Sequence, residues 1–318
     1  MLLKLSREMA QYRITSKQEV TDYCKEIYTN GYTKGLTTGI TPLDAHYTFR
    51  KGELTIMTGF ANIGKTTTQL FLMMMASKLY DWKWLMYCPE NEPVGDLMID
   101  IAEMYCGKTA DKDFSDRIDQ TEYLRAIDWA YEHFSVLTFD ETPTVEDVLG
   151  AFEEYMQVVK IDGVSIDPLN DLKAAEKQSK YEYYYDALSN IRRFVKKHNI
   201  AFYLVVHPGT AANRRRNEDG TRPAPNMSDV EFGAMFGNRA DNFIVFHRNP
   251  QSEKWNVTEI HIQKIKFQKL VGVPTPEPDP IALFYSYQKR RFQYLNENGS
   301  LIDPIQETII KTRTNDIF

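Results

Sequence analysis

The chain has 318 residues, a formal net charge of −6 and 42% hydrophobic residues. This length holds one large α/β domain or two ordinary ones, and the apolar content is sufficient for a substantial core. The acidic balance excludes a surface that is basic all over, so a nucleic-acid contact has to be local, in a channel or a loop. The three cysteines cannot form an even disulfide framework and lack metal-ligand spacing, which favours a reducing compartment.

The amino-terminal residues predict neither a signal peptide nor a membrane anchor. MLLKLSREMAQYRI carries charges directly behind a short apolar opening, and no run in the chain approaches the ~20 apolar residues of a spanning helix. We therefore expect no membrane association and a cytoplasmic location, in a bacterial or phage-infected cell.

Residues 1–34 are polar and charged, and they predict one helix from about Ser16 to Tyr28. Ser16 can cap this helix, with Glu19 three positions further on as in a capping box. Its apolar face would consist of Val20, Tyr23, Cys24 and Ile27. Such a helix packs either on its own domain or on a neighbouring subunit, and both possibilities stay open.

The stretch from Leu54 to Leu79 has the order of a strand, a glycine loop and a helix. The loop reads GFANIGKT, which has the spacing of a P-loop, the phosphate-binding loop of many nucleotide triphosphatases. The alternative is a glycine turn before a buried helix, and the agreement of strand, spacing and helix argues against it. The predicted nucleotide-binding residues are Gly59, Ala61, Asn62, Ile63, Gly64, Lys65, Thr66 and Thr67.

Each residue type in this loop suits a triphosphate. Gly59 and Gly64 let the backbone turn so that its N–H groups point inward, and the helix that starts near Lys65 adds its positive end. Lys65 is expected to reach the β and γ phosphates, and the Thr66 hydroxyl is expected to bind Mg²⁺.

Strands and helices alternate after this point, which predicts an α/β fold with a mostly parallel central sheet flanked by helices. Strands are expected at residues 84–87, 136–139, 164–166, 201–206, 242–247, 258–264 and 282–287, and helices at 97–105, 122–133, 144–157 and 181–198. Residues 210–226 are polar and contain Gly and Pro, which is typical of a long mobile loop.

Ligands of such a sheet bind at the carboxyl ends of its strands, and three polar residues follow strands there. Asp167 follows an apolar strand and suits the Mg²⁺-binding Walker B role. Glu90 is the candidate that polarises the attacking water, with Glu92 as the alternative. His207 could contact the γ-phosphate, although its spacing alone favours a loop histidine with a structural partner.

Basic residues cluster in two places. Arg214, Arg215 and Arg216 lie in the long loop, and Lys264 and Lys266 lie on or just after a late strand. Charged runs are usually solvated faces. In an acidic protein, however, an arginine triplet on a loop suits the phosphate backbone of a nucleic acid, without any reading of sequence.

From about Gly35 to Phe292, the order of elements resembles the RecA-type motor domain of the hexameric replicative DNA helicases, the DnaB and Twinkle group, especially its phage-encoded members. The stretches that carry the resemblance are TGITPLD at 38–44, the P-loop, YCPEN at 87–91, IDPL at 166–169, VVH at 205–207, residues 228–241, and IQKIK at 262–266.

The resemblance implies a role for each strand-end residue. Glu90 matches the catalytic glutamate of the family, Asp167 its Walker B aspartate, and His207 the polar sensor after the next strand. It further implies ATP or another NTP with Mg²⁺, single-stranded DNA as substrate, and a ring, with a hexamer as the expected form and a primase or loader as a partner.

Residues 229–233, with Glu231 and Gly233, match a loop that faces single-stranded DNA. Lys264 and Lys266 match a Lys-x-Arg pair that reaches into the nucleotide site of the next subunit. Two departures are visible: Lys266 occupies the position of the arginine finger, and the DNA-facing loop is one residue short and lacks its arginine. Lysine is a point charge without the bidentate fork of arginine.

We therefore expect a linker or assembly helix in residues 1–34, a motor domain in 35–300 and a tail in 301–318, with no space for a primase or a helical N-terminal domain. The expected function is a replicative helicase motor. Two alternatives stay open: a RecA-like, DNA-dependent ATPase of recombination or helicase loading that does not unwind DNA, and a degenerate ATP-binding switch or scaffold.

Overall fold

The structure is a computed structural model that describes residues 14–174 and 178–307. The chain divides into two compact units, residues 1–34 and 35–318. In the first unit, α1 (Lys17–Asn30) begins at a capping box, in which the Ser16 hydroxyl accepts from the Glu19 N–H and the Glu19 carboxylate accepts from the Ser16 N–H. The predicted helix is confirmed, and no residue of α1 is buried.

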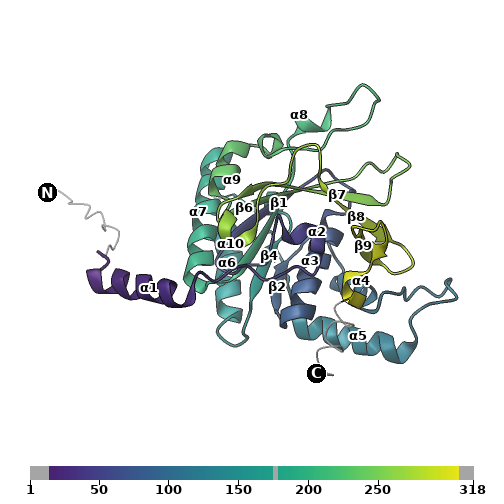
Figure 1. Cartoon of the computed structure of the whole chain (residues 1–318), viewed down its shortest axis with the longest axis horizontal. Coiled ribbons are helices and arrows are strands. Elements are labelled where there is room, and N and C mark those ends of the chain that lie inside the picture. The colour runs from purple at the N-terminus through teal and green to yellow at the C-terminus, as the bar shows by residue number, and fades with distance from the viewer. Residues whose placement is uncertain (1–13, 175–177, 308–318) are drawn as a thin grey trace. The chain divides into compact units, whose positions relative to one another are not determined.

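The described part of the second unit contains a ten-stranded sheet of order β10-β9-β8-β7-β6-β1-β5-β4-β2-β3 (Figure 1). Neighbouring strands from β6 to β3 are parallel, and those from β6 to β10 are antiparallel. The parallel part consists of β1 (Leu54–Thr58), β2 (Trp84–Tyr87), β3 (Phe134–Leu137), β4 (Gly163–Ile166), β5 (Ala201–Val206) and β6 (Asn242–His247). The antiparallel part adds β7 (Val257–Ile265), β8 (Ile281–Ser286), β9 (Arg291–Leu295) and β10 (Leu301–Ile302).

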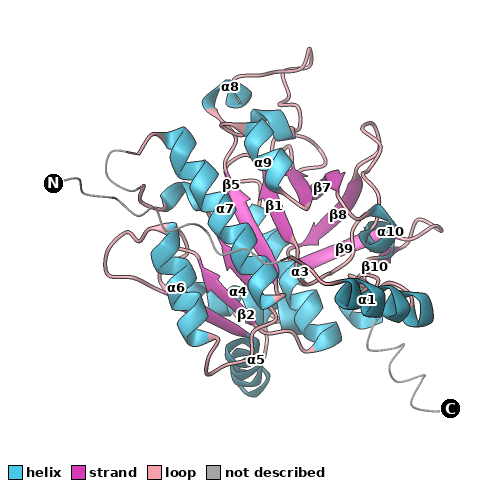
Figure 2. Cartoon of the chain, turned by 90° about the vertical axis from the view of Figure 1, so that its left-hand side faces the viewer, coloured by secondary structure: helices cyan, strands magenta, loops and turns pink. Residues whose placement is uncertain are grey.

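Helices cover both faces of the parallel strands, as Figure 2 shows. One core cluster includes residues of α3 (Lys65–Tyr80), α4 (Val94–Cys106) and α5 (Gln120–His133). The other includes residues of α6 (Val145–Tyr155), α7 (Lys180–His198) and α9 (Gly233–Arg239). Every residue of β1, β2, β4, β5 and β6 is therefore buried, which explains why these strands are mostly apolar in sequence.

The strand between α5 and α6 lies earlier than predicted. It spans Phe134–Leu137 rather than 136–139, because α5 ends at His133 and the chain passes directly into β3. The remaining short helices are α2 (Thr41–Asp44), α8 (Thr210–Asn213), α10 (Gln268–Val271) and the 3₁₀ turns η1 (Leu169–Asp171) and η2 (Met227–Asp229). In the described residues, no helix is both long and apolar enough to cross a membrane.

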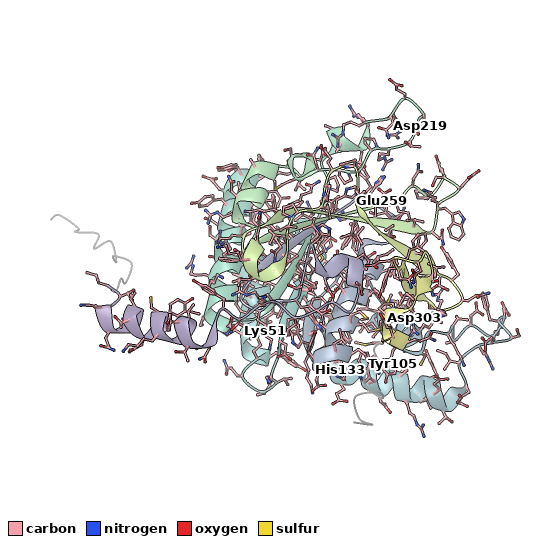
Figure 3. The ribbon with its side chains drawn as sticks, in the orientation of Figure 1. Lys51, Tyr105, His133, Asp219, Glu259 and Asp303 are labelled. Atoms are coloured by element: carbon pink, nitrogen blue, oxygen red, sulfur yellow. The ribbon has the colours of Figure 1, made fainter. Side chains whose placement is uncertain are left out.

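The last two strands were not predicted from the sequence, and β10 lies within the segment expected to be a tail. It pairs with β9, and Asp303 follows it directly. The Asp303 carboxylate binds the buried Arg291 guanidinium at 2.7 Å, and Arg291 also donates to the carbonyl of Met104 at the end of α4 (Figure 3 labels Asp303). The sheet therefore continues beyond residue 300.

Candidate active site

The loop between β1 and α3 has the backbone that a phosphate-binding loop requires. A Cβ on Gly59 would lie 2.6 Å from both the Phe246 carbonyl oxygen and the Ile63 Cδ1, so the position admits only glycine. Gly64 has φ +82°, in the left-handed region that glycine adopts at little cost. The strand, loop and helix order predicted from the sequence is confirmed.

Lys65 lies inside this loop with 8% of its surface exposed. Its ammonium donates to the Phe60 carbonyl at 2.9 Å. Burial lowers the pKa of Lys65, and the nearby carboxylates of Asp167 and Glu90 partly oppose this shift. The positive charge is therefore held among the loop's own backbone groups, where a polyphosphate would lie.

Asp167 directly follows β4 and faces the first turn of α3. The Thr66 hydroxyl donates to Asp167 Oδ2 at 2.8 Å, and the Asp167 side chain is buried. Burial raises the pKa of Asp167 to about 6, more than the Thr66 hydrogen bond and the charge of Lys65 lower it. A hydroxyl and a carboxylate are oxygen ligands of the kind that Mg²⁺ binds together with phosphates, so this pair fits the metal of the predicted site.

Glu90 and His207 follow β2 and β5, and the structure brings their side chains together. His207 Nε2 lies 3.7 Å from Glu90 Oε1, and the backbone N–H of His207 donates to Asn170 Oδ1 at 3.0 Å. Burial and the charge of Lys65 lower the pKa of His207, while Glu90 raises it. Glu90, rather than the alternative Glu92, is thus the carboxylate next to the loop lysine and the strand-end histidine.

Several polar residues at this site were not found from the sequence. Asn170 and Asp171 belong to η1, and Asp171 affects the pKa of both Asp167 and His207. Arg248 follows β6, and its guanidinium donates to the Asn62 carbonyl at 3.0 Å. Arg248 could have been found by extending the strand-end rule to β6, the parallel neighbour of β1.

Lys264 and Lys266 lie towards the opposite edge of the sheet, where the amino ends of the parallel strands lie. The Lys264 ammonium donates to the carbonyls of Gly237 and Ala240 at 2.7 and 2.8 Å, and Lys266 forms an ion pair with the buried Asp241 at 3.0 Å. Asp241 precedes β6 and accepts from the N–H of the first residue of β1. Because β1 has five residues, at roughly 3.3 Å each, about 17 Å separates this edge from the P-loop. These lysines do not reach the nucleotide site of their own chain.

The residues expected to contact DNA lie in and near the segment after β5. Arg215 forms an ion pair with Asp229, and the Arg216 guanidinium donates to backbone carbonyls of its own segment. Glu231 lies 3.4 Å from the ammonium of Lys180. Arg214 and Glu231 are exposed.

Gly233 is different, because it is buried where α9 begins. A Cβ there would lie 2.2 Å from the Met227 carbonyl oxygen. Its backbone therefore packs against η2, while the neighbouring residues Glu231, Phe232 and Ala234 are exposed.

Comparison with known proteins places the chain among P-loop ATPases. The family model described as "AAA domain" matches residues 45–213, just over half of the 318 residues. Over 254 residues, or 77% of the chain, it is 28% identical to the Twinkle homolog protein, chloroplastic/mitochondrial, of Arabidopsis thaliana. The match covers 35% of that protein, so the chain spans about a third of the length of this curated relative.

Solved structures show the same fold. A structure described as an ATPase domain matches with a TM-score of 0.69 at 17% identity, over 87% of this chain and 97% of that one. A DnaB-like replicative helicase, described with its interactions with primase, matches with 0.67 at 16% identity over 88% and 68%. The RadB recombinase matches with 0.54 at 16% identity over 82% and 100%. The predicted RecA-like fold and the resemblance to the DnaB and Twinkle group are confirmed.

Proposed function

We propose that this chain, which belongs to the AAA domain family, is the motor domain of an NTP-driven replicative DNA helicase that uses ATP and Mg²⁺. One observation carries the proposal. Lys65, Asp167 and His207 meet at one edge of the sheet, and Glu90 lies 3.7 Å from His207. The similarity to the Twinkle homolog and the DnaB-like fold support a helicase among the functions of P-loop ATPases.

The residues divide the work of phosphoryl transfer between them. The P-loop backbone and Lys65 bind the phosphates, and Thr66 with Asp167 would hold Mg²⁺, which neutralises phosphate charge when bound. Glu90 orients the attacking water and accepts its proton. His207 is neutral at pH 7 because its pKa is lowered, so it offers a hydrogen bond without a charge to the terminal phosphate.

The second half of the site comes, we propose, from a neighbouring copy in a ring, with a hexamer as the expected form. Lys264 and Lys266 are too far from their own P-loop to act there, which supports an action in trans. Helix α1 has no buried residue and suits packing on an adjacent subunit. Arg214–Arg216 and Glu231 would face single-stranded DNA, and a primase or loader would be a further partner.

The proposal is tested by NTP hydrolysis and by unwinding of a forked duplex. Single-stranded DNA should stimulate hydrolysis, and Lys65→Ala should abolish it. Glu90→Gln should lower turnover by about 10²–10⁴-fold while leaving nucleotide binding within a few-fold of wild type. Glu92→Gln, two residues away, is the matched control and should retain turnover. Full activity of Lys65→Ala would sink the proposal.

The fold likeness to RadB favours one alternative, a DNA-dependent ATPase of recombination or helicase loading. It predicts DNA-stimulated hydrolysis without strand separation, so the forked-duplex assay discriminates between the two. A degenerate switch or scaffold would bind nucleotide with negligible turnover.

A further inference from the structure

A cavity of about 450 Å³ lies beside the tip of the P-loop. Its walls are residues 60–63 of the P-loop, Arg216 with the turn at 219–222, and residues 248–252 after β6. The turn belongs to the segment that follows α8, and Figure 3 labels Asp219 within it. Three parts of the chain that are remote in sequence thus enclose one space next to the phosphate-binding backbone.

The charges around this cavity favour an anion. Arg216, Arg222 and Arg248 line it, against a single carboxylate, Asp219. Asp219 is already engaged, because it accepts from both the N–H and the hydroxyl of Thr221. The Nε of Arg248 is buried without a hydrogen-bond partner in the described structure. Guanidinium groups are well matched to phosphate oxygens.

The segment with Arg216 and Arg222 is held over the P-loop by its own contacts. The Arg222 guanidinium lies 4.5 Å from the centre of the Phe60 ring. Phe60 is the residue that follows Gly59 in the P-loop. On one side, Arg215 pairs with Asp229. On the other, Gln263 of β7 accepts from the backbone N–H of Met227 at 2.6 Å. The segment thus crosses the tip of the P-loop between two fixed points.

We infer that Arg216 and Arg222 form, together with Arg248, an anion subsite for phosphate groups of the nucleotide held by the P-loop, and that residues 214–222 act as a lid over it. This inference rests on the proposed function, since it requires the P-loop to bind a nucleotide. It assigns the arginine segment to nucleotide binding in cis, in addition to the DNA contact expected from the sequence.

One consequence concerns coupling. The same short segment carries Arg214, which is exposed to solvent, and Arg222, which faces the P-loop. A nucleotide that fixes Arg222 therefore also fixes the loop that carries Arg214. Binding of the nucleotide and binding of DNA then favour each other, because whichever binds first has already ordered the segment.

The test compares Arg222→Gln with Lys254→Gln in the full chain. Both variants remove one positive charge, but Lys254 is exposed and lies outside the cavity lining and outside the lid. Calorimetric titration with Mg–ADP should show a Kd about tenfold weaker for Arg222→Gln, as expected for one lost charge-assisted hydrogen bond. Lys254→Gln should stay within twofold of wild type. Arg216→Gln is the second cavity variant, in case Arg222→Gln does not fold.

Limited trypsin digestion reads the lid directly. Mg–ADP should slow cleavage at Arg214–Arg216 in the wild type, relative to cleavage at the exposed Lys112 in a distant loop, and this protection should be absent in Arg222→Gln. Unchanged Mg–ADP affinity of both cavity variants, or equal cleavage with and without nucleotide, overturns the inference. A tenfold loss confined to single-stranded DNA binding would assign the subsite to DNA phosphates instead and also overturns it.

These outcomes are separable from the proposed function. A wild-type chain that binds Mg–ADP and protects the segment, but neither responds to DNA nor unwinds a fork, would contradict the helicase and leave the lid supported. A helicase whose lid variants behave as wild type would contradict the lid alone.

Discussion

Two buried aspartates lie at opposite edges of the parallel part of the sheet, Asp241 at the amino ends of its strands and Asp167 at their carboxyl ends. Their carboxylates have different kinds of partner. Asp241, 1% exposed, has Lys266 at 3.0 Å and the N–H of Leu54 at 3.1 Å. Asp167, 3% exposed, accepts from the Thr66 hydroxyl, and its pKa is raised to about 6. A buried carboxylate is costly unless it is paired. The fold therefore pairs Asp241 directly with a cation, whereas Asp167 has a hydroxyl donor and feels the charge of Lys65 without an ion pair to it, as we expect of a carboxylate that a bound Mg²⁺ would complete.

The largest expected effect concerns Lys266, the partner of Asp241. Lys266→Ala should reduce DNA-stimulated turnover by about 10²-fold or more, because in the proposed ring the transition state would lose a charge contributed by the neighbouring chain. Mixing the Lys266→Ala protein with the Lys65→Ala protein tests whether Lys266 acts in the nucleotide site of another chain. Each variant alone should have little or no activity, but a mixed ring would contain sites with an intact P-loop beside an intact Lys266. Steady-state hydrolysis should therefore rise above that of either variant.

A cis role of Lys266 predicts no such recovery at any ratio of the two variants, and that result would contradict the action in trans. Lys266→Arg serves as the control for folding, because it keeps the ion pair with Asp241. It should retain turnover, since arginine occupies this position in the family that the chain resembles.

The second effect concerns the stability of the nucleotide-free chain. The folded-state pKa of Asp167, about 6, lies above the unfolded value of 3.8, so the folded state favours the protonated form. Below about pH 3.8 the group is protonated in both states, so its burial as a carboxylate costs no stability. The cost grows as the pH rises from about 3.8 to about 6. Asp167→Asn is neutral throughout. It should raise the free energy of unfolding by about 2–3 kcal/mol at pH 7.5 and by little at pH 4.

Urea denaturation in the presence of a chelator, at both pH values, measures this difference. An equal effect of Asp167→Asn at pH 4 and pH 7.5 would show that burial of the Asp167 carboxylate does not destabilise the folded state.

The smallest effect is expected at the paired edge, with the opposite sign. Asp241→Asn keeps an acceptor for the N–H of Leu54 but leaves Lys266 without its anion. Because the Lys266 side chain is 40% exposed, water can solvate much of its charge. The free energy of unfolding should fall by about 1–2 kcal/mol at pH 7.5, measured by urea denaturation beside Asp167→Asn. If Asp241→Asn instead raised the free energy of unfolding, as Asp167→Asn should, the two aspartates would not differ in the way described.

The parallel half of the molecule was predictable because its physics is local. Buried parallel strands are continuous apolar runs, and the P-loop has a fixed glycine spacing, so β1, β2, β5 and β6 could be placed within a residue. Strand-end carboxylates followed from the same rule. Ser16 and Glu19 likewise define the start of α1 by themselves.

The rest depended on contacts between remote residues. The short strands β9 and β10 are stabilised by Arg291, which binds Asp303 and the end of α4, and nothing near them in sequence indicates this partner. The position of Arg222 over Phe60 likewise follows from how a long loop folds back. The sequence already favoured Glu90 over Glu92, and the position of His207 adds a structural reason for this choice.

Strand β6 joins the two edges in one piece. Its six residues are all buried, its amino end follows Asp241, and its carboxyl end continues into Arg248, which binds the P-loop carbonyl of Asn62. A packed interior is hardly compressible and transmits strain, so β6 is a direct mechanical connection between the two edges. A displacement of the loop by a bound phosphate would then be transmitted towards Asp241 and its partner Lys266. In the proposed ring, this linkage would let each motor report the contents of its own site to the next one.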